Sequence, residues 1–358
     1  MTNAVNIAQS GSNNVTFRNK IINGAMVFDQ RNAGASVGAT SSAPYTLDRY
    51  YAYAFASSKY TVQQNAGSVT PPAGFRNYLG VTSTAATTPG ATDSYTLGQN
   101  IEGYNVADLS WGTSNAKPIT LSFQIYSSLT GTFGGVVKNS DSSRSYPFTY
   151  AISSANTWTS ISITIAGDTS GTWLTTNGIG IQLVFGMGVG STYSGTAGAW
   201  ASANYNTATG VTNVVGTNGA TWYVTGVQLE AGTTASPFEY RQYGTELALC
   251  QRYYERSYDI GQTTGSFSAG WRGTNTVAAT SGNEGPAWTF AVPKRTAPTV
   301  TFYQAVSGAA GYGYQVSTAA SIALGSRYVG QTAIGIIDYT SSGGANSYWI
   351  HFTASAEL

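Results

Sequence analysis

The sequence predicts an all-β protein: an antiparallel jelly-roll sandwich, then a short connector helix and a smaller C-terminal β domain. Its 358 residues include 43 Gly and 25 Tyr, but only 9% are charged. Aromatic and β-branched side chains suit a half-buried pleated sheet, and Gly, Asn and Ser favour turns. Alternating apolar and polar residues recur between turn clusters, whereas residues 246–257 combine good helix formers without Gly or β-branched residues.

Four parts are expected along the chain. Residues 1–20 are rich in Asn, Ser and Thr without periodicity, which indicates an extended arm that orders only against a partner. The sandwich is expected to span residues 21–240, the connector 241–258 and the distal β domain 259–358. The sequence has no fixed repeat period, which argues against a β-helix or a propeller.

Alternation is clearest in three runs of the sandwich, residues 118–127, 158–167 and 178–187. Every second residue in them is apolar, as expected for strands with one buried face. The apolar faces consist of Ile119, Leu121, Phe123 and Ile125 in the first run, Ile161, Ile163 and Ile165 in the second, and Ile179, Ile181, Leu183, Phe185 and Met187 in the third.

A further strand, residues 221–230, changes phase in its middle. Trp222 and Val224 keep one phase, Val227 and Leu229 keep the other, and Gly226 lies at the switch. A glycine at a phase change predicts a β-bulge, because one extra residue turns the following side chains to the opposite face. Many such strands without intervening helices favour an antiparallel jelly roll.

The distal domain shows the same strand signals over about a hundred residues. The expected strands are residues 286–292, 298–304, 312–318, 333–340 and 346–354.

The connector is expected to form one short helix. Leu247, Cys250 and Tyr254 have spacings i, i+3 and i+7, and Glu246 lies near the N-terminal end, where the helix dipole favours a carboxylate. A helix this short is marginal in water, so it must pack on something. Either it packs on its own chain, or three copies pack around a threefold axis. The residues at that axis would be Leu247, Cys250, Arg252, Tyr253, Tyr254, Glu255 and Arg256.

Composition excludes several classes of partner. With 16 Lys and Arg against 15 Asp and Glu, the net charge is +1, so no basic surface for nucleic acid or an anionic membrane is expected. The single cysteine, Cys250, excludes a disulfide framework within the chain. No leader-like apolar segment and no run of about 18 apolar residues occurs, so neither Sec export nor membrane insertion is expected.

The stretch VTGVQLEAGTTASPFEYRQYGTELALCQRYYERS (224–257) resembles the joint of tail-fibre-like and capsid-appendage proteins of tailed bacteriophages. In that family a domain similar to carbohydrate-binding modules passes into an ELALCQRYYE-type connector. NKIINGAMVFDQRNAG (19–34), TLDRYYAY (46–53) and ITIAGDTSGTW (163–173) resemble its other markers, in order. The segments 290–303 and 352–358 resemble its C-terminal domains more loosely. Tyr50 departs from the family, which more often has Trp there.

The resemblance implies a homotrimeric virion appendage that contacts host-surface polysaccharide. Its arm would bind other virion proteins of the tail or capsid, and the distal domain would point outward. Such a protein assembles in the host cytoplasm, leaves by lysis and is located in the virion. A tail fibre and a capsid decoration protein, such as a cement, head-fibre or knob protein, remain alternatives at this point.

Aromatic residues in loops are the expected glycan-binding side chains, since a flat ring covers the C–H face of a sugar and its polar edge forms hydrogen bonds. Trp158 and Trp222 begin strands and are expected in the core or at its rim. The candidates are Trp111, Tyr193, Trp200 and Tyr205 in the sandwich, and Trp271 and Arg272 in the distal domain.

Catalysis is not expected. His351 is the only histidine, no Ser/His or Cys/His pair is evident, and no multi-histidine zinc site is possible within one chain. A glycosidase needs two carboxylates, and Glu102 with Asp108 is the nearest local pair. A polysaccharide depolymerase is a remote alternative, and no cofactor or metal is expected. Asp48 with Arg49 is expected to form a structural ion pair, and Lys294 with Arg295 a solvated turn.

Overall fold

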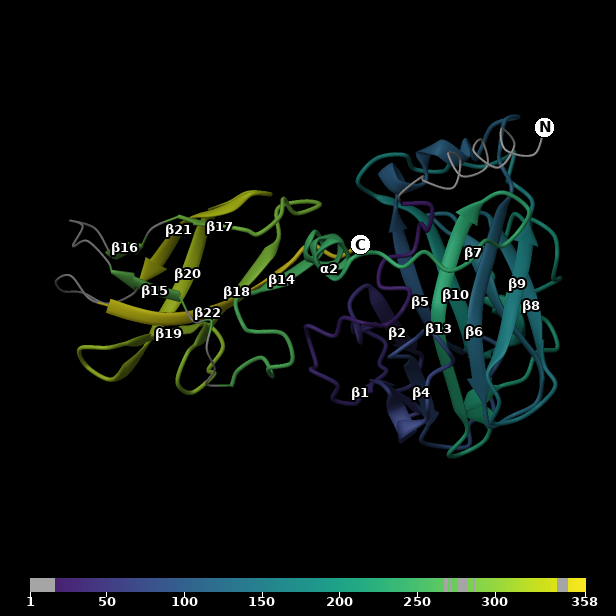
Figure 1. Ribbon diagram of the computed structural model, residues 1–358, viewed down its shortest axis with the longest axis horizontal. Helices are drawn as coiled ribbons and strands as arrows, with labels where there is room; N and C mark the ends of the chain where they lie inside the picture. The colour runs from purple at the N-terminus through teal and green to yellow at the C-terminus, as the bar shows by residue number, and fades with distance from the viewer. Residues whose placement is uncertain (1–16, 267–269, 271, 276–282, 286, 340–346) are drawn as a thin grey trace, which may run out of the picture.

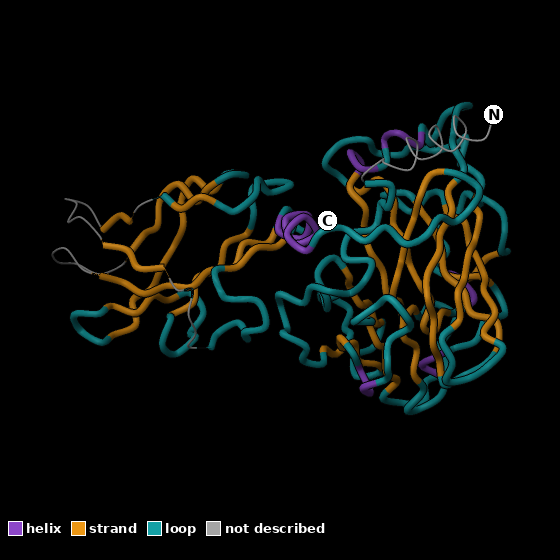
Figure 2. The backbone as a smooth tube through the Cα atoms, in the orientation of Figure 1, coloured by secondary structure: helices purple, strands orange, loops and turns teal. Residues whose placement is uncertain are grey.

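The computed structural model describes residues 17–266, 270, 272–275, 283–285, 287–339 and 347–358 (Figure 1). The prediction of an all-β fold is confirmed: antiparallel sheets dominate, and α2 (Tyr243–Gln251) is the one α-helix of the described residues. Figure 2 shows α2 between a large sandwich and a smaller set of strands. No described helix has the length and apolar character needed to cross a lipid bilayer.

Two antiparallel sheets form the sandwich. The first, in spatial order, consists of β1 (Val37–Gly38), β3 (Tyr60–Gln64), β4 (Leu79–Ser83), β13 (Thr221–Ala231), β6 (Ile119–Ser127) and β9 (Thr159–Ile165). The second consists of β2 (Tyr50–Ala54), β5 (Ser94–Glu102), β10 (Ile179–Val189), β7 (Gly131–Lys138) and β8 (Ser145–Ile152). We call them the six-stranded and the five-stranded sheet. Non-consecutive strands lie side by side in both, as in a jelly roll.

The core lies between the sheets and matches the predicted apolar faces. Leu121 and Ile125 of β6 and Leu183 of β10 are fully buried, because alternate residues of a strand point to the same side. Trp222, expected in the core or at its rim, is also fully buried, and its indole N–H donates to the Tyr150 hydroxyl at 2.9 Å.

The predicted bulge at Gly226 is confirmed. Thr225 of β13 pairs with Gln124 of β6, but the next pair is Gln228 with Ser122, so β13 carries one extra residue there. Gly226 has φ 62°, and a Cβ on it would lie 2.6 Å from the Phe75 ring. Glycine is therefore required both by the left-handed backbone and by the ring that packs on it.

Short elements connect the sandwich strands. They are the 3₁₀ turns η1 (Ala66–Ser68), η2 (Gly103–Asn105), η3 (Ala107–Leu109), η4 (Ser191–Tyr193) and η5 (Val214–Gly216), and the parallel two-stranded pair β11 (Ser194–Gly195) and β12 (Thr207–Ala208). The end of the predicted arm is bound to the sandwich, because the backbone N–H of Lys20 donates to Leu229 O at 2.8 Å. Residues 1–16 lie outside the described residues.

The connector helix is confirmed but shorter than predicted. It ends at Gln251 with Arg252 as its C-cap, and β14 (Tyr254–Arg256) pairs with β22 (Ser347–Ser355) of the distal sheet. Tyr254 is therefore not on the helix face where the i+7 spacing placed it. These residues extend the distal sheet instead, because tyrosine is as compatible with a strand as with a helix.

Most of the residues predicted at a threefold axis are buried within the chain itself. Cys250, Tyr253, Tyr254, Glu255 and Arg256 are all buried there, whereas Leu247 and Arg252 are half-buried. The connector packs on its own chain, and its threefold association remains a prediction. Burial raises the pKa of the Cys250 thiol, which is thus an inert core group.

The distal unit consists of antiparallel strands arranged around β22. Besides β14 and β22 it contains β15 (Arg272–Asn275), β16 (Asn283–Gly285), β17 (Trp288–Thr289), β18 (Thr299–Gln304), β19 (Tyr312–Gln315), β20 (Ala320–Val329) and β21 (Ala333–Tyr339). The sequence analysis missed β20, whose side chains are mostly half-buried and so lack a clear alternation. The domain boundaries drawn from the sequence remain a prediction.

Buried ion pairs join the two units, and we call this contact region the joint. Glu357, just after β22, pairs with both Arg31 and Arg49 of the sandwich, and the Arg49 side chain is 1% exposed. The Arg49 guanidinium also lies 3.6 Å from the Tyr253 ring centroid. In Figure 1 the C-terminus lies beside α2, at this joint. The predicted Asp48–Arg49 pair is wrong, since Asp48 instead faces Arg31 at 3.8 Å.

Two further cations of the joint come from the distal unit. Lys294 is 1% exposed and pairs with Glu255 at 2.6 Å. Arg295 reaches across to the sandwich and donates to Asn177 O at 2.8 Å and to Glu357 O at 2.8 Å. The prediction of a solvated turn is therefore wrong for both residues. Arg295 contacts the sandwich, whereas Lys294 binds the end of α2, at Gln251 O, on the distal side of the joint.

Candidate functional site

A groove of about 570 Å³ lies on the outer face of the six-stranded sheet. Its floor consists of Ser122 and Gln124 of β6 and Ser160 and Ser162 of β9. Their neighbours in sequence point into the core, so these side chains point to the opposite, outer face. The sheet thus supplies a row of small polar groups on a rigid support.

Three aromatic side chains from two loops form the wall of this groove. The Phe75 ring lies 5.2 Å from the Phe238 ring and 5.5 Å from the Tyr240 ring, measured between centroids. Tyr240 is 58% exposed, and its hydroxyl donates to Gly74 O at 2.9 Å, which ties the two loops together. The bulge at Gly226 positions the wall, because Phe75 packs directly on that glycine.

The floor keeps hydrogen-bonding capacity for a ligand. The Gln124 amide donates to the Ser160 hydroxyl at 2.8 Å, and both side chains have further donors or acceptors. None of the described residues that line the groove is charged. A neutral polar floor beside exposed aromatic rings is suited to binding polyhydroxylated compounds rather than ions.

A second aromatic cluster lies on the same face of the sheet. Tyr78, Tyr126, Trp158 and Tyr223 form it, and Tyr126 stacks on Tyr223 with 5.4 Å between ring centroids. Tyr126 and Trp158 are each two residues from a floor residue, so the cluster continues the floor along β6 and β9. Burial raises the pKa of the Tyr78 and Tyr223 hydroxyls, so both stay neutral at physiological pH.

The predicted tryptophans are elsewhere and are engaged with each other. Trp111 and Trp200 lie 5.4 Å apart in an edge-to-face contact, and both pack on Trp173. Their indole N–H groups donate to Lys117 O at 2.7 Å and Ala166 O at 2.8 Å. Trp111 is only 7% exposed. This cluster closes one end of the sandwich core, and its polar groups are used internally.

The other predicted aromatic residues do not form a common site. Tyr193 and Tyr205 are half-buried, and the Tyr205 ring covers Gly195, where no Cβ fits. The Arg272 guanidinium lies 5.3 Å from the Phe352 ring and 5.6 Å from the Trp288 ring, so it packs on its own unit. Trp271 lies outside the described residues.

The carboxylates considered for glycosidase chemistry are separately paired. Glu102 accepts from Arg252 at 2.6 Å and from the Tyr253 hydroxyl at 2.6 Å, whereas Asp108 pairs with Lys20 at 2.8 Å. No set of three or more His, Cys, Asp or Glu suited to a metal occurs in the described part of the chain.

One Ser/His contact was not evident from the sequence. The Ser257 hydroxyl lies 3.0 Å from His351 Nδ1, and it also accepts the Phe352 backbone N–H at 2.9 Å. His351 is fully buried and stacks on Tyr258 at 3.7 Å between ring centroids. The pair therefore fixes β22 against the segment that follows β14.

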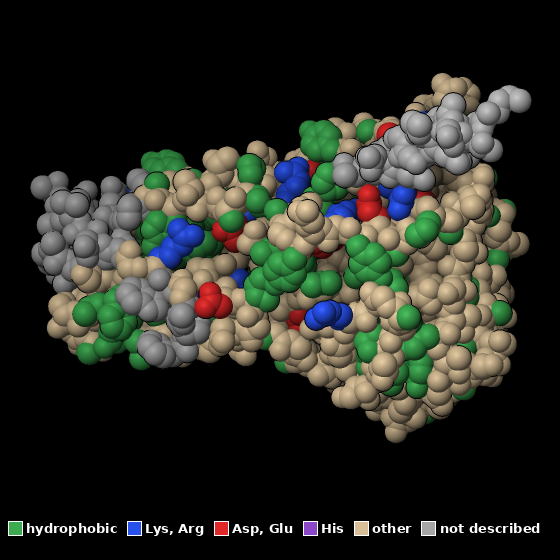
Figure 3. Space-filling view, viewed as in Figure 1, with side chains coloured by type: hydrophobic (Ala, Val, Ile, Leu, Met, Phe, Trp, Pro, Cys, Tyr) green, Lys and Arg blue, Asp and Glu red, His purple; other side chains and the backbone are tan. Residues whose placement is uncertain are grey.

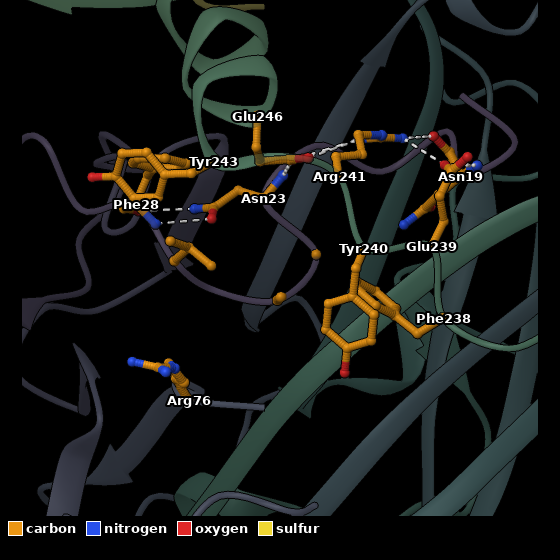
Figure 4. Close-up of a pocket in the computed structure, with 13 residues that line it drawn as sticks. Asn19, Asn23, Phe28, Arg76, Phe238, Glu239, Tyr240, Arg241, Tyr243 and Glu246 are labelled. Atoms are coloured by element: carbon orange, nitrogen blue, oxygen red, sulfur yellow. Dashed lines mark hydrogen bonds and ion pairs between the residues drawn. The ribbon is translucent and has the colours of Figure 1, made fainter. Parts of the chain in front are cut away.

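A smaller pocket of about 230 Å³ lies on the other side of the same aromatic wall, toward α2. Figure 4 shows Phe28 and Tyr243 at one end, and Phe238 and Tyr240 at the other. Arg241 pairs with Glu246 at 3.2 Å and with Glu239 at 3.3 Å, and the exposed Arg76 also lines this pocket. The pocket thus lies between the aromatic wall and α2.

Sequence reasoning missed the groove for a physical reason. The polar positions of β6 and β9 are legible from their alternation, but the wall comes from loops. Phe75 follows a Pro-rich turn and Phe238 follows β13, some 160 residues later. Nothing local indicates that the two rings meet. The usable signal was the glycine at the bulge, which marks a close approach by another group.

Comparisons with known proteins give only distant likenesses. No family model matches the chain, and no curated protein matches its sequence. A tailspike protein 4 domain of bacteriophage CBA120 is 10% identical over 60% of this chain, with a TM-score of 0.33. This chain covers about a fifth of that protein, 21% of its length.

Two carbohydrate-binding modules are similar at the same low level. The family 11 module from Clostridium thermocellum, solved with a mixed-linked tetrasaccharide, is 14% identical over 52% of this chain and 91% of its own, with a TM-score of 0.28. The N-terminal cellulose-binding domain of Cellulomonas fimi β-1,4-glucanase C is 12% identical over 44% and 80%, with a TM-score of 0.27.

Proposed function

We propose that this chain is a non-enzymatic appendage of a tailed-bacteriophage virion and that its groove binds an uncharged glycan of the host surface. The residues of the groove are the observation that supports glycan binding. Phe75, Phe238 and Tyr240 offer ring faces to the C–H side of sugars, while Gln124 and the floor serines offer neutral hydrogen-bonding groups.

The absence of charge in the groove selects the class of glycan. A carboxylated or phosphorylated sugar needs a cation near its anionic group to offset the loss of hydration. The described residues that line the groove include no lysine or arginine. Neutral, hydroxyl-rich glycans lose less hydration free energy on entering such a site, so they are the expected ligands.

The motifs shared with tailed-phage appendages support the virion assignment. They run in order from residue 19 to residue 257 and include the connector that the structure places at the joint. The resemblance also implies a homotrimer, a link to other virion proteins through residues 1–20 and release from the host by lysis. These three points remain predictions.

Binding of purified protein to a panel of soluble host polysaccharides, measured by affinity electrophoresis, tests the proposal. Phe238→Ala and Tyr240→Ala are each expected to weaken binding about tenfold, because they remove central aromatic contacts. Tyr104→Ala is the matched control, since Tyr104 is 61% exposed but lies outside the groove. No new reducing ends should appear during incubation with the polysaccharide.

A loss of binding in Tyr193→Ala, with unchanged binding in both groove variants, would move the glycan site to the 191–206 segment. Equal loss in Tyr104→Ala would indicate a nonspecific aromatic effect. New reducing ends that disappear with one carboxylate substitution would contradict the non-enzymatic assignment.

A further inference from the structure

The edges of the two sandwich sheets differ in how they are protected. An exposed edge strand presents unpaired backbone N–H and C=O groups, and proteins usually cover, shorten or charge it, or place proline in it. Three of the four edges here have such protection. β1 has only two residues, and β8 contains Pro147, whose carbonyl accepts the Gly198 N–H at 2.9 Å.

The edge of β2 is covered by the preceding loop. Its residues form isolated bridges with that loop, Tyr51 with Tyr45 and Tyr53 with Thr40, and Ala52 N donates to Pro44 O at 3.0 Å. The backbone groups on that side of β2 are therefore already paired.

β9 has none of these protections among the described residues. It is seven residues long, TSISITI, with no charged residue and no proline, and its register against β6 runs without a bulge from Thr159 to Ile165. Its main-chain groups pair only with β6 within the described chain. Ile161 and Ile163 face the core but stay half-buried, because nothing covers them from the side.

We propose that β9 pairs antiparallel with β9 of a second copy of this chain, about a twofold axis at Ser162. The strand is nearly palindromic about that residue. Ile161 then faces Ile163 of the partner copy, and Ser160 faces Thr164, so apolar residues meet on the core side and hydroxyls on the outer side.

The lack of charge in β9 permits pairing with a second copy. In a twofold pair each residue near the axis faces itself or its symmetry mate, so any charge there would face a like charge. β9 carries none. Pairing also extends the six-stranded sheet across both copies and completes the burial of Ile161 and Ile163.

The pairing has a consequence for binding. Ser160 and Ser162 belong to the groove floor, so the two grooves become neighbours on one continuous sheet. One glycan chain can then contact both copies, which raises avidity without new contacts. This twofold contact is distinct from the threefold association that the resemblance implies.

Cysteine cross-linking of the full chain tests the geometry. Ser162→Cys places two thiols opposite each other across the axis, within the Cα separation that a disulfide spans. The native Cys250 is buried and does not compete. Mild oxidation should convert most Ser162→Cys protein into a covalent dimer. Thr61→Cys, half-buried on the outer face of β3, is the matched control and should remain uncross-linked.

Sedimentation gives the second measurement. The twofold contact should give a dimer, or an even-numbered assembly of trimers where the threefold association also forms. Ser162→Lys should raise the dissociation constant of the twofold contact at least about tenfold, because two ammonium groups would face each other. Circular dichroism checks that both variants fold. A wild type that stays monomeric at its highest soluble concentration would overturn the proposal. So would a trimer that is insensitive to Ser162→Lys, or equal cross-linking of both cysteine variants.

Discussion

The joint and the groove use opposite chemistry within one charge-poor chain. Arg31, Arg49, Lys294 and Arg295 are gathered in the joint with their carboxylate and carbonyl partners, whereas every described residue that lines the groove is uncharged. Figure 3 shows charged side chains around the region between the two units, and few over the rest of the visible sandwich surface. Part of the chain's scarce charge thus fixes one unit on the other.

This difference indicates that the two regions have different tasks. A buried ion pair contributes less to stability than its geometry suggests, but it strongly penalises arrangements that break it. The joint therefore fixes the orientation of the distal unit. The groove, without fixed charges, binds through ring faces and hydroxyl groups, which tolerate changes of ionic strength.

Arg49→Met should have the largest effect on stability. It leaves Glu357 with Arg31 as its remaining partner in a buried site and removes the cation from the Tyr253 ring. We expect the free energy of unfolding to fall by about 3 kcal/mol, measured by denaturant titration. The matched control is Arg327→Met, because Arg327 pairs with Asp338 at the surface and is 50% exposed. Its expected loss is below about 1 kcal/mol.

Equal losses in these two variants would contradict the contrast between the joint and the surface. The analysis requires two-state unfolding. Unfolding curves followed by fluorescence and by circular dichroism should therefore have the same midpoint.

Asp48 makes the joint sensitive to pH. Burial, opposed by Arg31, raises the pKa of this carboxyl to about 6. The folded state therefore binds the proton more tightly than the unfolded state. That stabilising contribution is complete below the unfolded pKa near 3.8 and is lost as pH rises through about 6.

Comparison with Asp48→Asn isolates this effect, because the amide does not titrate. The wild-type free energy of unfolding, relative to the variant, should fall by up to about 3 kcal/mol between about pH 4 and about pH 7. Chemical denaturation across that range at constant ionic strength measures it. Parallel curves for the two proteins would mean that Asp48 does not titrate there.

Gly226→Ala should couple a modest loss of stability to a loss of binding. The new Cβ would occupy a left-handed backbone position and lie 2.6 Å from the Phe75 ring, so the groove wall must move. We expect a loss of about 1–3 kcal/mol and weaker glycan binding. Gly210→Ala is the control, since it has φ 80° but no atom within 4 Å of its added Cβ. It should lose stability without losing binding.

Strands with one buried face could be predicted from the sequence, and loop contacts could not. β6 and β10 follow from their apolar alternation, and the bulge follows from the phase change at Gly226. β20 could not be predicted, because its side chains are mostly half-buried on both faces and show no alternation. The helix was predicted too long, since local propensity does not reveal that β22 pairs with Tyr254.

The candidate site depended on contacts that are far apart in sequence. Trp111 and Trp200 lie in loops, where the sequence predicts ligand-binding aromatic residues, yet they complete the core because three tryptophans converge there. Lys294 was assigned to solvent because charged residues usually lie there, whereas Glu255 holds it in the joint. Such partners become visible only when the chain is folded.

Calorimetric titration with a neutral and a carboxylated polysaccharide, each at about 50 mM and about 500 mM NaCl, tests the central claim most directly. We predict that the neutral chain binds the wild type with an affinity that changes less than about twofold with salt, and that Tyr240→Ala lowers it. Preferential binding of the carboxylated chain, with an affinity that falls steeply as salt rises, would contradict a groove that binds without charge.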